Sequence, residues 1–107
     1  MSNIPLKGWP SDVIKTIYEW FFNTIDEQEI VAFYIGRTND ITSAKKRYGC
    51  DEIFTLYETD NADNAIDVED ALIKIFSTHP KCDNDFEDDE DKVSDEYLNY
   101  VYVAVWY

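Results

Sequence analysis

Two stretches of the chain repeat apolar residues at the spacing of a helix that buries one face. The first begins at Pro10-Ser11, with Ser11 as its expected N-cap, and continues to Ile25. The second begins at its expected N-cap Asn64 and ends before Pro80. The predicted core stripes of the two helices are Val13, Ile14, Ile17, Tyr18, Phe21 and Ile25, and Ala65, Val68, Leu72 and Ile75.

Three other segments have the residue pattern of strands. Residues 30–36 are mostly β-branched or aromatic, which predicts a buried strand, and residues 53–57 predict a second one. Residues 97–106 predict a long third strand with two distinct faces. One face would carry Val101, Val103 and Val105, and the other Tyr100, Tyr102 and Trp106. We expect strand 30–36 to lie at the centre of the sheet and to share that sheet with the third strand.

A brief helix is predicted between the first two strands. Thr38-Asn39-Asp40 supplies capping side chains, and the helix runs through Lys46 until Gly49 stops it. The order is therefore α-β-α-β-α-loop-β. We predict a single α+β domain over residues 1–107, in which helices flank a small central β-sheet and an acidic loop occupies residues 83–96. With 45% apolar residues, the chain can build one core.

The charge balance indicates what kind of partner the chain can have. It carries nine Lys and Arg against 23 Asp and Glu, for a net charge of −14. Because non-specific nucleic-acid affinity comes from cations that neutralise phosphates, direct DNA binding is not expected, and a basic protein partner is favoured. The two cysteines predict reduced thiols in a cytoplasmic protein. No apolar run is long enough to predict a membrane span.

The densest charge lies near the end of the chain. Nine carboxylates occur between Asp83 and Glu96, opposed only by Lys92. The spacing does not fit an EF-hand, because Asp88 and Ser94 occupy the positions that require Gly and Glu. No cofactor is therefore expected from this segment, and it is either a solvated loop or a surface that binds a basic partner. The predicted partner-binding residues are Asp85, Glu87, Asp88, Asp89, Glu90 and Asp91.

The segment Phe33-Tyr34-Ile35-Gly36-Arg37, followed by a short basic helix, resembles the second half of the GIY-YIG nuclease motif. Two later segments match in order: 68–73 resembles the helix that presents a metal-binding Glu, and 80–84 the segment with a late Asn. The resemblance spans about residues 20 to 84. It implies a one-metal phosphodiester hydrolase in which Tyr34 works around the attacking water, Arg37 or Arg47 stabilises phosphate charge, Glu69 holds Mg²⁺ and Asn84 is the late Asn.

Two positions depart from the family pattern. Phe22 falls where the first family Tyr should be, and a phenyl ring has no hydroxyl to move a proton. The family Arg falls on Ala44, so Lys45 or Arg47 would have to replace it from a neighbouring position. We still expect Tyr34 and Glu69 to share one face of the domain, with an incomplete arrangement of charges around them.

Three interpretations of the function follow. In the first, a degenerate GIY-YIG scaffold serves as a non-catalytic acidic interaction protein, a DNA mimic that blocks a basic, nucleic-acid-binding surface of a host defence or nuclease protein. Its size and composition suit a phage or mobile-element inhibitor. The alternative is an active, Mg²⁺-dependent GIY-YIG endonuclease. The third is an assembly module whose acidic loop only promotes solubility.

Overall fold

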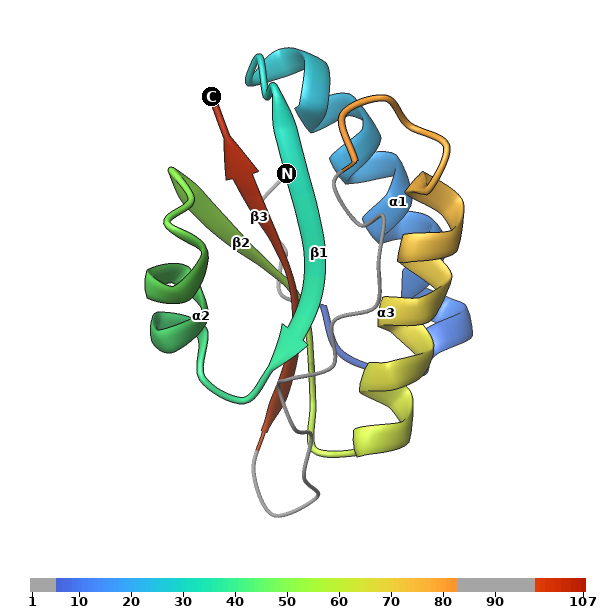
Figure 1. Cartoon of the computed structure of the whole chain (residues 1–107). Helices are drawn as coiled ribbons and strands as arrows, with labels where there is room; N and C mark the ends of the chain where they lie inside the picture. Colours follow the sequence, from blue (N-terminus) through green and yellow to red (C-terminus); the bar gives the residue numbers. More distant parts are fainter. Residues whose placement is uncertain (1–5, 83–97) are drawn as a thin grey trace.

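Helices and strands alternate along the chain in the computed structural model, which describes residues 6–82 and 98–107. The elements are α1 (Pro10–Glu27), β1 (Ala32–Thr38), α2 (Ile41–Tyr48), β2 (Glu52–Thr59), α3 (Ala62–Phe76) and β3 (Asn99–Trp106). The predicted α+β class and order of elements are confirmed. The predicted acidic loop, 83–96, lies outside the described residues. As Figure 1 shows, α1 and α3 cover one face of the sheet and α2 lies on the other.

The three strands form an antiparallel sheet in the order β1-β3-β2. The central strand is therefore β3, and the prediction that 30–36 would be central is wrong. Residues 101–105 are buried on both faces of the sheet, as a central strand requires. β1 is an edge strand whose side chains are buried in the cores on the two faces of the sheet, and another segment covers part of its free edge. There the Phe33 amide donates a hydrogen bond to the carbonyl oxygen of Lys81 at 2.9 Å.

The larger core lies between the sheet and the two helices α1 and α3. The rings of Phe21 and Phe33 meet edge to face at 5.0 Å between centroids, and Phe76 packs on Phe33 at 5.6 Å. The predicted core position Ile75 is wrong, because its side chain is 41% exposed. Phe76, one turn after Leu72, fills the core there instead. The buried helix residues are Val13, Ile17, Phe21, Ile25, Ala65, Val68, Leu72 and Phe76.

The helix ends follow the chemistry of their capping residues. Asp40 caps α2, as predicted, and its Oδ1 accepts a hydrogen bond from the Ser43 amide at 3.2 Å. This hydrogen bond is the main cause that lowers the pKa of Asp40. Gly49 ends the helix with φ 59°, a left-handed conformation that favours glycine.

The other two helices begin two and three residues earlier than their predicted N-caps imply. Asn61, not Asn64, caps α3, and its Oδ1 accepts a hydrogen bond from the Asn64 amide at 3.0 Å. Trp9 precedes α1, and Pro10 occupies the first helical position, so Ser11 lies within the helix. In the described part of the chain, no helix is long and apolar enough to cross a membrane.

Candidate functional site

Tyr34 and Gly36 lie on the face of the sheet that α2 covers. Tyr34 is only 7% exposed, and its ring centroid lies 4.9 Å from that of Tyr48 on α2. Gly36 is paired across the strands with Tyr102, which is fully buried. Tyr34 and Gly36 therefore lie against a packed aromatic cluster on the α2 side of the sheet, whereas Ile35 between them points into the larger core.

Arg37 and Glu69 meet on the opposite face. Arg37 projects from β1 toward α3, and its Nη1 donates to Oε1 of Glu69 in an ion pair. The Arg37 side chain is 20% exposed and that of Glu69 only 7%, so the two charges are largely removed from water. Arg37 Nε is buried and finds no hydrogen-bond acceptor among residues 6–82 and 98–107.

The sheet thus divides the residues predicted for a nuclease site. Side chains alternate along a strand, so Tyr34 and Arg37, three positions apart, point to opposite faces. Glu69 lies on the Arg37 side, and the expectation that it shares a face with Tyr34 is wrong. Arg47 is exposed on α2, with its guanidinium carbon 5.3 Å from the centroid of the Tyr48 ring. Asn84 lies outside the described residues.

The carboxylate predicted to hold a metal is engaged by a cation. A Mg²⁺ site needs open oxygen ligands, and Glu69 instead forms a buried pair with Arg37. Within the part of the chain that the structure describes, no three His, Cys, Asp or Glu side chains gather as a metal site. Cys50 is 8% exposed, and burial raises the pKa of its thiol. A buried thiol with a raised pKa is not an activated nucleophile, so Cys50 does not form a reactive centre with Tyr34.

The exposed charges are distributed unequally between the two faces of the sheet. Lys45, Lys46 and Arg47 are exposed on α2, which contains no acidic residue. The only cations on the two helices of the opposite layer are Lys15 and Lys74. The exposed acids of those two helices are Asp12, Glu19, Asp26 and Glu27 on α1, and Asp63, Asp67 and Asp70 on α3. We call these seven residues the acidic helix layer.

The aromatic side chains of the described residues differ in how far they are exposed. Tyr100 and Trp106, close to the predicted acidic loop in the sequence, are only partly exposed. Among the described residues, the most exposed large apolar side chain is Trp9, at 67%. Sequence reasoning missed it because it precedes the helical stripe of α1. Pro10 is the sequence signal that indicates an exposed Trp9, because a proline at the first helical position leaves the preceding side chain outside the helix.

The predicted partner-binding residues, Asp85 and 87–91, lie outside the described residues, so their role stays a prediction. Comparison of the chain with protein-family models, with curated proteins and with solved structures found no match.

Proposed function

We propose that the chain is a non-catalytic acidic interaction protein that occupies a basic, nucleic-acid-binding surface of another protein. The scaffold is a degenerate relative of the GIY-YIG nucleases, and the biological role is that of a phage or mobile-element inhibitor of a host defence or nuclease protein. Its acidic surface takes the place that the phosphates of a nucleic acid occupy on the partner.

The observation that carries this proposal is the excess of negative charge and its arrangement. The net charge is −14, and the acidic helix layer places seven exposed carboxylates on two adjacent helices. Like charges held this close repel one another, and a basic partner relieves the repulsion on binding. The same field steers a positively charged surface into contact and repels DNA.

The contacts of the nuclease-like residues support a role without catalysis. Phosphodiester cleavage requires an activating group, a phosphate-binding cation and a metal ligand within reach of one reacting phosphate. Here Tyr34 packs under α2, whereas the Glu69 carboxylate is paired with Arg37 on the other side of the sheet. A cation that neutralises Glu69 competes with the metal that the nuclease reaction needs. Tyr34, Arg37 and Glu69 instead perform packing and pairing roles.

A pull-down from the native host with the immobilised chain tests the proposal. We expect a basic nucleic-acid-binding protein to be retained at low ionic strength and released as the salt concentration rises, because exposed charges are screened over about 10 Å at 0.1 M salt. Added duplex DNA should release the partner from the immobilised chain, since DNA and the chain compete for the same surface of the partner. A neutral polymer at the same concentration is the control.

Two results would contradict the proposal. One is a retained partner that is acidic, or that holds the chain and duplex DNA at the same time. The other is cleavage of DNA by the purified chain with Mg²⁺ or Mn²⁺. In that assay Glu69→Gln is the appropriate variant, because it keeps the size of the side chain in its buried position.

A further inference from the structure

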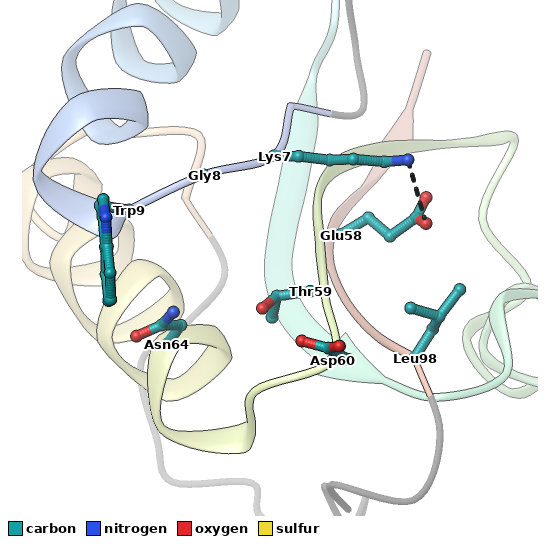
Figure 2. A pocket seen from close by; sticks show the side chains of 8 residues that line it. All are labelled: Lys7, Gly8, Trp9, Glu58, Thr59, Asp60, Asn64 and Leu98. Atoms are coloured by element: carbon teal, nitrogen blue, oxygen red, sulfur yellow. Dashed lines mark ion pairs between the residues drawn. The ribbon is translucent and has the colours of Figure 1, made fainter.

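A hollow of about 380 Å³ opens where the start of α1, the end of β2 and the start of α3 meet. Figure 2 shows Trp9 and Asn64 along one side, and the Lys7–Glu58 pair and Leu98 along the other, with Thr59 and Asp60 between them. The strand end is held in place from the N-terminal segment, because the Tyr57 hydroxyl donates a hydrogen bond to the carbonyl oxygen of Gly8.

The hollow combines an open aromatic surface with a carboxylate. Trp9 is 67% exposed, and its side chain makes no capping hydrogen bond to α1, so its indole is available to a ligand. Glu58 is paired with Lys7, their charged atoms 3.6 Å apart. Asp60 is exposed, and in the described ranges no cation lies within ion-pair distance of it. With Lys7 and Glu58 cancelling each other, Asp60 leaves the hollow with one net negative charge.

We infer that this hollow binds an arginine side chain of the basic partner. The inference rests on the proposed function and names the place where that function acquires specificity. The guanidinium lies over the indole of Trp9 and pairs with the Asp60 carboxylate, while the aliphatic stem contacts Leu98. Steering by the overall charge needs no particular geometry, whereas this hollow selects one side chain.

The chemistry of the hollow favours arginine over lysine. A guanidinium is planar, is less strongly hydrated than an ammonium, and stacks on an aromatic face while its edge donates to a carboxylate. An ammonium is a compact point charge without a flat face. It therefore cannot stack on the indole and pair with the carboxylate as well as a guanidinium does. A neutral side chain would leave the charge of Asp60 without a partner. Arginine therefore uses both features of the hollow at once.

The test uses the full chain and three short peptides that alternate glycine with arginine, with lysine or with citrulline, the uncharged analogue of arginine. Binding is followed by titration calorimetry and by the NMR signal of the Trp9 indole N–H. The arginine peptide should bind most tightly and shift the Trp9 signal, the lysine peptide should bind more weakly, and the citrulline peptide should not bind. Equal binding of all three peptides, or no binding of the arginine peptide, overturns the inference.

Variants separate the hollow from the general charge of the surface. Asp60→Asn and Glu29→Gln each remove one exposed carboxylate, and Glu29 follows the far end of α1. Asp60→Asn should weaken binding of the arginine peptide about threefold more than Glu29→Gln does. Trp9→Ala should weaken it about threefold, and Trp9→Phe less, because a phenyl ring keeps part of the cation–π attraction.

The outcomes distinguish this inference from the proposed function. If Asp60→Asn and Glu29→Gln weaken binding equally and Trp9→Ala has no effect, only general charge acts. The inference then fails while the pull-down result stands. If the pull-down yields no basic partner but the arginine peptide binds at Trp9, the proposed function fails and the hollow remains an arginine site.

Discussion

Replacing Gly36 with alanine is expected to lower the free energy of unfolding by about 3 kcal/mol, the upper range for an overpacked core. A Cβ at this position would lie 2.5 Å from Oη and 2.7 Å from Cζ of Tyr102, and 3.0 Å from Cε1 of Tyr34. Both rings are buried in the cluster between the sheet and α2, so a shift of either ring disturbs the packing of its neighbours. The two strands would have to separate at this pair.

Gly49→Ala is the matched control for this prediction. A Cβ at Gly49 meets nothing within 4 Å, but φ is +59°, so the cost is backbone strain alone, about 1 kcal/mol. Urea unfolding followed by circular dichroism measures both variants. If Gly36→Ala is no less stable than Gly49→Ala, the packing of Tyr102 over Gly36 is not as described.

Breaking the Arg37–Glu69 pair from either side is the second large expected effect. Glu69→Leu leaves the guanidinium of Arg37 without its carboxylate, and Arg37→Met leaves a carboxylate that is 7% exposed without its cation. Removal of one partner of a fully buried pair costs about 3–5 kcal/mol. Because Arg37 is 20% exposed, water compensates part of the loss, and we expect about 2 kcal/mol for each single variant.

The double variant Arg37→Met, Glu69→Leu tests whether the cost comes from the pair itself. Two apolar side chains leave no unpaired charge, so the double variant should be more stable than the sum of the single effects predicts, by about 2 kcal/mol. Urea unfolding of all four proteins closes the cycle. Additive effects would mean that Arg37 and Glu69 do not stabilise each other. They would contradict the proposal that Arg37 competes with a metal for the Glu69 carboxylate.

Local sequence patterns predicted the elements well. The stripe Val13, Ile17, Phe21 and Ile25 repeats at helical spacing and is buried as expected. Asp40 and Gly49 have short-range chemistry that marks the two ends of α2. The alternation of valine with other side chains along 101–106 predicts the two faces of β3 correctly. Each of these signals depends only on neighbours within a few positions.

The errors concern contacts between distant parts of the chain. The apolar run at 30–36 predicts a central strand, because nothing in it indicates that the distant Lys81 covers its free edge. The motif resemblance placed Tyr34 and Glu69 together, although strand alternation puts Arg37, not Tyr34, on the side of α3. The hollow beside Trp9 joins residues 7–9, 58–60, 64 and 98, which no local pattern connects.

The central claim is tested most directly by the rate at which the chain associates with the partner that the pull-down identifies. The measurement compares the unchanged chain with a variant in which Glu87, Asp88, Asp89 and Glu90 are replaced by lysine, over a range of salt concentrations. The triple variant Lys45→Gln, Lys46→Gln, Arg47→Gln removes the exposed cations of α2 and is the control.

We expect the lysine variant to associate about tenfold more slowly, or slower still, at low ionic strength, with the difference shrinking as salt screens the charges. The control should associate at least as fast as the unchanged chain, because it becomes more negative. If the lysine variant associates at the unchanged rate at every salt concentration, the acidic segment does not recruit the partner and the account is contradicted.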